Sequence, residues 1–188
     1  MKDKYYIFLD IDGVLWDFQY RVSAIKEGII PKREILSSFN PKSIDALNNL
    51  IALTDKNFEP ELVISSSWRE NMFETKKILF ENGLEYNKPI NSTPWNLNPL
   101  FRGKEILEYL DYVGRTDNYV VIDDFSFDFS STLIKENIIK TNIANGSLNN
   151  EHIKIFITHH PELLEEKGTA NLAHCDFLNN FEENSPKQ

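Results

Sequence analysis

The sequence predicts an α/β fold, a three-layer αβα sandwich around a parallel central sheet. Short apolar segments alternate with amphipathic segments of helical period, and this alternation is typical of parallel βαβ units. Several apolar segments end abruptly in Asp or Ser, as buried strands do where they run into loops. Because there is no internal repeat and no shift of composition, we expect one domain, residues 1–181, followed by a polar tail, residues 182–188.

The first half of the chain supplies two strands and two helices. Residues 5–9 are an apolar run that predicts the first strand, and residues 61–64 predict the second. Between them, the dipeptide Asn40-Pro41 is typical of a helix N-cap followed by the first helical position. A helical pattern over residues 69–82 predicts the next helix.

The second half of the chain continues the alternation. Residues 87–99, rich in Pro and Asn, predict a loop, and residues 102–112 predict an amphipathic helix. Residues 119–122 predict a third strand and residues 138–142 a fourth. In parallel sheets ligands bind beyond the carboxyl ends of the strands, so the residues that follow the strands are the candidates for a site.

Composition narrows the class of protein. Hydrophobic residues make up 41% and charged residues 26%, as in soluble globular proteins. The net charge of -9 opposes broad binding to nucleic acid, although a local basic cluster can still hold one phosphate. A single cysteine excludes an intramolecular disulfide and fits a reducing compartment. Without a signal-peptide pattern or a run of about 20 apolar residues, we expect a cytoplasmic protein with no membrane contact and no obligate protein partner.

Four carboxylates follow the first and third predicted strands. Asp10 and Asp12 come directly after the first strand, and Asp123 and Asp124 come after the third. Carboxylates this close raise one another's pKa values, and a shared divalent cation relieves the repulsion. Ligands that are all oxygen favour a hard cation, so the sequence predicts a Mg²⁺ site.

Serines follow the second predicted strand. The hydroxyls of the serines at residues 65–67 and the backbone N–H groups that follow, at the start of a helix, suit a phosphate oxygen, although the serines could merely cap that helix. Arg69 lies close by and is either a contact to a substrate phosphate or a surface side chain. Arg21 is a weaker candidate of the same kind.

Four segments of the chain resemble, in order, the motifs of the haloacid dehalogenase (HAD) superfamily. They are FLDIDGVL at residues 8–15, VISSS at 63–67, FRGKEI at 101–106 and VVIDD at 120–124. The resemblance implies a Rossmann-like core and a phosphohydrolase. Members usually carry a cap domain between these motifs, but the intervals here are too short for a full one. We therefore expect little or no cap and an open site.

The resemblance also implies roles for single residues. Asp10 would attack phosphorus and form an aspartyl-phosphate. Asp12 would protonate the leaving group and then activate water, and an Asp at this position favours phosphate over halide chemistry. Ser65 would bind the transferring phosphoryl group through its hydroxyl, and Ser66 through its backbone N–H.

The remaining motifs would supply charge. Either Lys104 or Arg102 would neutralise the nucleophile and the phosphate, with Lys104 narrowly preferred, and both could instead be solvated helix residues. Asp124 would bind Mg²⁺ together with Asp10 and the Asp12 carbonyl. Asp123 would be a further ligand or would support one.

A narrower resemblance concerns the substrate. The strings VISSSWR, FRGKEI and VVIDD, with the later KTNIANGSL, look like a small subfamily related to phosphatase modules of RNA-repair proteins. This implies a terminal phosphate on a nucleic acid or nucleotide as substrate. Two alternatives stay open: a phosphatase of small phosphorylated metabolites, and a non-catalytic phosphate- or nucleotide-binding module on the same fold.

Overall fold

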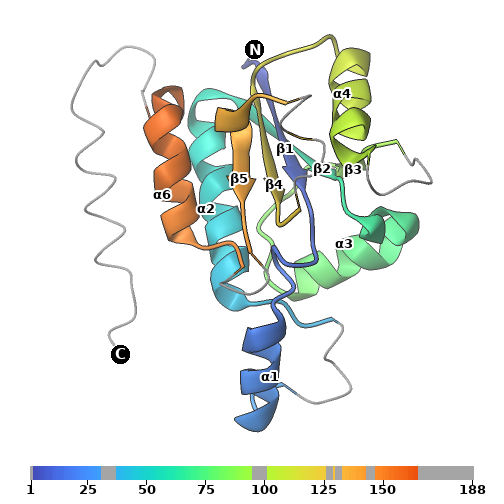
Figure 1. The fold of residues 1–188 in the computed structure, drawn as a ribbon, viewed down its shortest axis with the longest axis vertical. Helices are drawn as coiled ribbons and strands as arrows, with labels where there is room; N and C mark the ends of the chain where they lie inside the picture. Colours follow the sequence, from blue (N-terminus) through green and yellow to red (C-terminus); the bar gives the residue numbers. More distant parts are fainter. Residues whose placement is uncertain are drawn as a thin grey trace.

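A parallel sheet organises the molecule (Figure 1). The computed structural model describes residues 2–30, 37–94, 101–125, 129, 133–142 and 147–164. Within these residues the strands lie in the order β3-β2-β1-β4-β5, and all pairs are parallel. They are β1 (Lys4–Leu9), β2 (Glu59–Ile64), β3 (Asn91–Ser92), β4 (Tyr119–Asp123) and β5 (Ile138–Lys140). The α-helices are α1 (Phe18–Lys26), α2 (Pro41–Asn57), α3 (Met72–Glu81), α4 (Arg102–Tyr112) and α6 (Asn150–His159).

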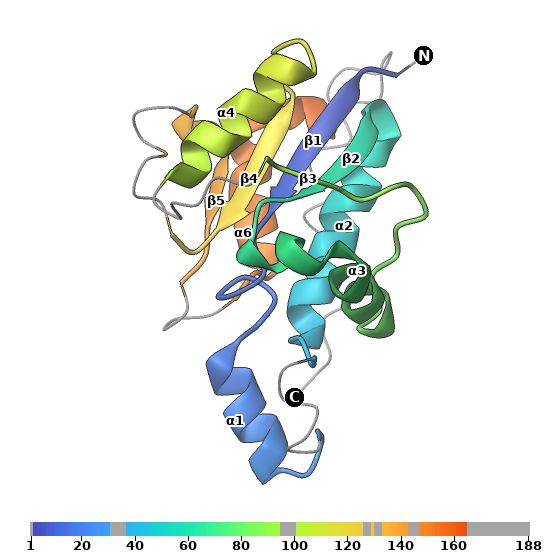
Figure 2. The same ribbon diagram turned by 90° about the vertical axis from the view of Figure 1, so that its right-hand side faces the viewer.

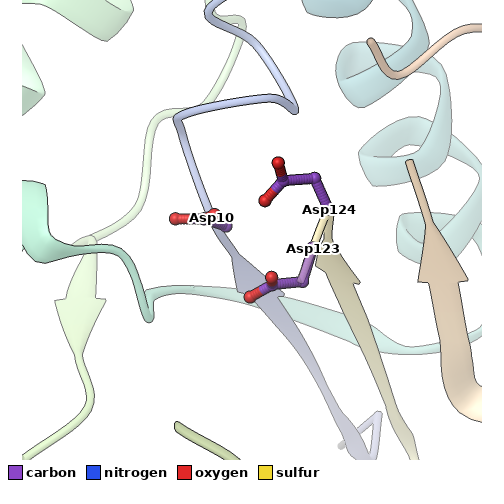
Figure 3. Close-up of side chains that lie close together, drawn as sticks. All are labelled: Asp10, Asp123 and Asp124. Carbon is purple, nitrogen blue, oxygen red and sulfur yellow. The ribbon is translucent and has the colours of Figure 1, made fainter. Parts of the chain in front are cut away.

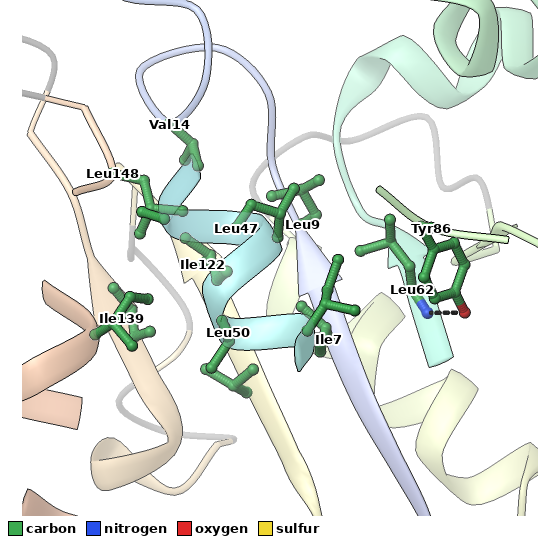
Figure 4. Packing of buried hydrophobic residues seen from close by; sticks show 14 of the residues in the cluster. Ile7, Leu9, Val14, Leu47, Leu50, Leu62, Tyr86, Ile122, Ile139 and Leu148 are labelled. Carbon is green, nitrogen blue, oxygen red and sulfur yellow. Dashed lines mark hydrogen bonds between the residues drawn. The ribbon is translucent and has the colours of Figure 1, made fainter. Parts of the chain in front are cut away.

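Helices cover both faces of the sheet, which confirms the predicted three-layer sandwich (Figure 2). Because side chains alternate along a strand, Ile7 and Leu9 of β1 join the core beneath α2 and α6 (Figure 4). Phe8 faces the other way and packs against Tyr109 of α4, with ring centroids 5.6 Å apart. Leu50 of α2 is fully buried, and burial of such a side chain contributes about 2 kcal/mol.

The structure corrects three predicted boundaries. The helix expected over residues 69–82 begins instead with a 3-10 turn, Ser67–Asn71, and becomes α-helical at Met72. The predicted loop over residues 87–99 contains strand β3, which is only two residues long and has no apolar run to mark it. The fourth predicted strand, 138–142, ends at Lys140.

The insertion after β1 is small. Asp17 caps α1 by accepting hydrogen bonds from the backbone N–H groups of Gln19 and Tyr20. Its other oxygen accepts from Asn40, the predicted N-cap of α2, at 3.2 Å. Helix α1 projects from the body beyond the carboxyl ends of the strands (Figures 1 and 2). This arrangement agrees with the expectation of little or no cap.

None of the helices in the described residues is both long and apolar enough to cross a bilayer. The single-domain boundary at residue 181 stays a prediction, and the predicted tail, residues 182–188, lies outside the described residues.

Candidate functional site

The strand register places three functional candidates in one row. Leu9 of β1 is paired with Ile64 of β2 and Ile122 of β4. The ladder continues one residue further, because the N–H of Ser65 donates to Leu9 and the N–H of Asp10 donates to Ile122. Neighbours in register on parallel strands point to the same face of a sheet. Ser65, Asp10 and Asp123 therefore all face α4.

The acidic side chains converge at the tips of β1 and β4 (Figure 3). Carboxylate oxygens of Asp10, Asp123 and Asp124 all lie within 4.8 Å of one another. The carboxylate of Asp12 lies outside this group, although its place in the metal site was predicted together with the other three. Only its backbone carbonyl, which the resemblance implied, remains a candidate ligand.

The charges of this group are in conflict. Burial and the nearby charge of Asp10 raise the pKa of Asp123 to about 8. The same two causes raise the pKa of Asp124. A bound divalent cation would lower both pKa values again. Because all the donors are oxygen atoms, the set fits Mg²⁺.

Arg102, rather than Lys104, meets the acidic group. The Nη1 atom of Arg102 is 3.0 Å from Asp10 Oδ2 and 2.5 Å from Asp123 Oδ2. Burial opposes the charge of Arg102, but the two carboxylates outweigh it and raise its pKa. Lys104 is exposed, and its Nζ is 3.9 Å from Glu108. Successive residues of an α-helix are rotated by about 100° about the helix axis. The side chain of Lys104, two positions after Arg102, therefore points away from that of Arg102.

Gly13 makes room for the acidic group. Its φ is +75°, in the left-handed region that favours glycine. A Cβ atom at this position would lie 2.3 Å from Asp124 Oδ2. The turn is also bonded to the residue that follows β5, because the hydroxyl of Thr141 donates to the Gly13 carbonyl at 3.0 Å. The glycine of the first motif is thus required by space as well as by backbone conformation.

Trp68 holds Asp12. Its indole N–H donates to Asp12 Oδ2 at 3.0 Å. The indole ring in turn packs on Phe39, with centroids 5.7 Å apart. Loss of hydration raises the pKa of Asp12, and the hydrogen bond from Trp68 opposes this shift. Sequence reasoning gave Trp68 no role, and only its place after the serines could have suggested one.

The segment after β2 joins the phosphate-binding candidates to α4. The hydroxyl of Ser65 is buried and has no hydrogen-bond partner within the described part of the chain, whereas that of Ser66 accepts from the N–H of Trp68. Arg69 donates to the carbonyls of Ser65 and Ser66, and its Nη2 is 2.6 Å from Glu105. Both partners of this ion pair are buried, so Arg69 is not a surface side chain.

Arg21 is buried without a hydrogen-bonded counter-ion among the described residues. Its side chain is fully buried, and its three nitrogens have no hydrogen-bond partner among the described residues. The guanidinium lies 4.1 Å from the ring centroid of Trp16. Burial lowers the pKa of Arg21 to about 10, and the charge of Asp12 opposes this shift. An unpaired buried charge is unfavourable unless a ligand of opposite charge pairs with it.

Comparison with known families agrees with this geometry. A family model described as the HAD domain in Swiss Army Knife RNA repair proteins matches residues 6–153, which is more than half of the chain. The chain belongs to this family. Searches of curated proteins and of solved structures found no significant match. The matched range of the HAD domain includes all four motifs and every site residue described above.

Substituting Ala for Gly13 should displace Asp124 and weaken a metal site at the strand tips. A left-handed non-glycine residue costs roughly 1–2 kcal/mol, and the contact with Asp124 adds to that. We expect the thermal unfolding midpoint to fall by roughly 4 °C or more. We also expect Mg²⁺ to raise the midpoint of the unaltered protein but not that of the variant.

Gly28 provides the matched control. Its φ is +72°, but nothing lies within 4 Å of the position of an added Cβ. Gly28→Ala should lower the midpoint only through backbone strain and should keep the full Mg²⁺-dependent rise. A Gly13→Ala variant stabilised by Mg²⁺ as strongly as the unaltered protein would contradict the assignment of Asp124.

Proposed function

We propose that this HAD domain is a Mg²⁺-dependent phosphomonoester hydrolase that acts through an aspartyl-phosphate on Asp10. The observation that carries the proposal is the convergence of Asp10, Asp123 and Asp124 within 4.8 Å, with the Arg102 guanidinium against two of them. A nucleophilic carboxylate beside a cation site is the arrangement that phosphoryl transfer requires.

In the first step an Asp10 carboxylate oxygen attacks phosphorus. A new O–P bond forms as the bond from phosphorus to the leaving oxygen breaks, and Asp12 gives its proton to that oxygen. The hydrogen bond from Trp68 occupies Asp12 Oδ2, which leaves Oδ1 to carry the proton. Trp68 is therefore a positioning residue for the acid.

In the second step water hydrolyses the aspartyl-phosphate. Asp12, now ionised, takes a proton from the water as its oxygen attacks phosphorus. The bond between phosphorus and Asp10 breaks, and inorganic phosphate leaves. The sum of the two steps is the conversion of a phosphomonoester and water into an alcohol and phosphate.

The other site residues hold the charge that moves during these steps. Asp10, Asp124 and the Asp12 carbonyl would hold Mg²⁺, with Asp123 as a further ligand or as support for Arg102. Bound Mg²⁺ supplies positive charge beside the phosphoryl oxygens. Arg102, rather than Lys104, neutralises the nucleophile, and Ser65 and Ser66 bind the phosphoryl group. Arg69 positions these serines through its bonds to their carbonyls.

The substrate we propose is a terminal phosphate on a nucleic acid or nucleotide. The family to which the chain belongs is described by its occurrence in RNA repair proteins. With a net charge of -9, contacts to a nucleic acid must be local, and the contact we propose is Arg21, whose nitrogens find no hydrogen-bond partner among the described residues. It would take a second phosphate of the substrate. The small insertion α1 leaves room for a large substrate.

Asp10→Asn should abolish phosphatase activity because the amide cannot serve as the nucleophile. We expect kcat on an aryl phosphate with Mg²⁺ to fall at least about 10³-fold, with the fold retained. Lys104→Met is the control, and it should keep nearly full activity because Lys104 is exposed. Phosphatase activity in the Asn variant would refute the assigned nucleophile. Failure of the unaltered protein to hydrolyse any phosphomonoester with Mg²⁺ would instead favour a non-catalytic binding module.

Trp68→Phe should impair the reaction most with poor leaving groups. These substrates need protonation by Asp12, whereas p-nitrophenolate leaves without much help. We expect kcat/KM to fall roughly tenfold or more for an alkyl phosphate and much less for p-nitrophenyl phosphate. Phe39→Leu perturbs the same packing without removing the hydrogen bond, so it should affect both substrates equally. Equal losses for both substrates in Trp68→Phe would rule out the positioning role.

Arg21→Met should lower activity on substrates that carry several phosphates and leave activity on substrates with one phosphate nearly unchanged. A lost hydrogen bond to a charged group predicts roughly a tenfold or greater fall in kcat/KM on a 3′-phosphorylated oligonucleotide. Activity on p-nitrophenyl phosphate should stay nearly unchanged. The unfolding midpoint should not fall, because the variant removes an unpaired buried charge.

Arg115→Met, at an exposed arginine, is the control for net charge and should leave both activities unchanged. If Arg21→Met lowers both activities alike, or neither, the proposed contact to a second phosphate is wrong. A panel of phosphorylated metabolites assayed in parallel tests the competing substrate class.

A further inference from the structure

The row of polar residues at the carboxyl edge extends one strand beyond Ser65. Strand β3 pairs Asn91 with Val63 and Ser92 with Ile64. The N–H of Thr93 donates to the Ile64 carbonyl at 3.1 Å, so the ladder continues and sets Thr93 beside Ser65. Since register neighbours on parallel strands share a face, the side chain of Thr93 points toward α4, as those of Ser65 and Asp10 do.

Thr93 differs from the other buried threonines of the described residues. The hydroxyl of Thr54 donates to Leu50, that of Thr75 to Trp68 and that of Thr141 to Gly13, at 2.8, 2.7 and 3.0 Å. The hydroxyl of Thr93, a residue with 3% of its surface exposed, has no hydrogen-bond partner in the part of the chain that the structure describes. More than about 90% of buried polar groups in proteins have one.

Two hydroxyls without partners thus lie next to each other. Ser65 Oγ is the second, and it too is buried. One unpaired hydroxyl is a local defect, whereas two on adjacent strand ends of the same face form a place for an acceptor that both can share. A phosphate oxygen is such an acceptor, because it is charged and carries several lone pairs.

The spacing of the strands agrees with a shared acceptor. Adjacent strands lie about 4.8 Å apart. One oxygen set slightly above the line between two hydroxyls at that separation lies roughly 2.8 Å from each, which is hydrogen-bonding distance. Asp10 lies on the other side of Ser65 in the same row, so this oxygen would belong to a group next to the nucleophile.

We propose that Thr93 is a further phosphate-binding residue, whose hydroxyl donates together with Ser65 to one oxygen of the phosphate. The inference rests on the proposed function, since it places the phosphate beside Asp10. It adds a fourth strand end to the site.

The experiment compares Thr93→Val with Thr54→Val. Both variants replace a buried hydroxyl by a methyl group, but only Thr54 has a hydrogen bond to lose. Each variant is assayed for its thermal unfolding midpoint without ligand and for its Kd for inorganic phosphate with Mg²⁺ present. Turnover of p-nitrophenyl phosphate is followed in parallel.

Thr93→Val should keep or raise the midpoint and should weaken phosphate binding roughly tenfold or more. Thr54→Val should lower the midpoint and leave the Kd unchanged. Thr93→Ser, which retains the hydroxyl, should restore phosphate binding to nearly that of the unaltered protein.

Two results would overturn the inference. In the first, Thr93→Val binds phosphate as tightly as the unaltered protein does. In the second, Thr93→Val loses stability as Thr54→Val does, with an unchanged Kd, which would show that the hydroxyl binds a structural water. A protein that binds phosphate through Thr93 but hydrolyses no phosphomonoester would uphold this inference and refute the proposed function.

Discussion

Repulsion among three carboxylates at one edge of the sheet is the constraint on which the site depends. Asp10, Asp123 and Asp124 are held within 4.8 Å by strands whose apolar residues are fully buried. The sheet supplies the free energy that keeps these charges together, and Arg102 offsets only part of their repulsion. The remaining conflict, visible in the raised pKa values of Asp123 and Asp124, is what makes the cluster suitable for a cation.

The parts of the site that surround this cluster are fixed by packing rather than by charge alone. Gly13 lets the first motif turn closely over Asp124, and Trp68 holds the carboxylate of Asp12 outside the cluster. Asp10 and Asp12, two residues apart in sequence, therefore have different surroundings. That difference lets one act as nucleophile and the other as acid in the reaction we propose.

Positive charge near the acidic group is sparse. The chain is acidic overall, and Arg69 is committed to a buried ion pair with Glu105. Arg21, on the projecting helix α1, is the buried cation whose nitrogens find no acceptor among the described residues. In the function we propose, a substrate with two phosphates would place one beside Asp10 and the other against Arg21, whereas a metabolite with a single phosphate would leave Arg21 without a phosphate partner.

The sequence by itself determined the α/β sandwich, the helix start at Asn40 and the strand ends that carry Asp10, Ser65 and the acidic pair, because apolar runs and capping residues are local signals. The tertiary structure decided what depends on direction and distance. Because of the turn of α4, Arg102 and not Lys104 contacts the acidic group. The Asp12 carboxylate lies outside that group, and Arg69 pairs with Glu105. The tertiary structure also revealed β3, whose two residues are too few for a periodic pattern, and with it the position of Thr93. Contacts between segments far apart in the chain leave no periodic trace in the sequence, so only the folded arrangement shows them.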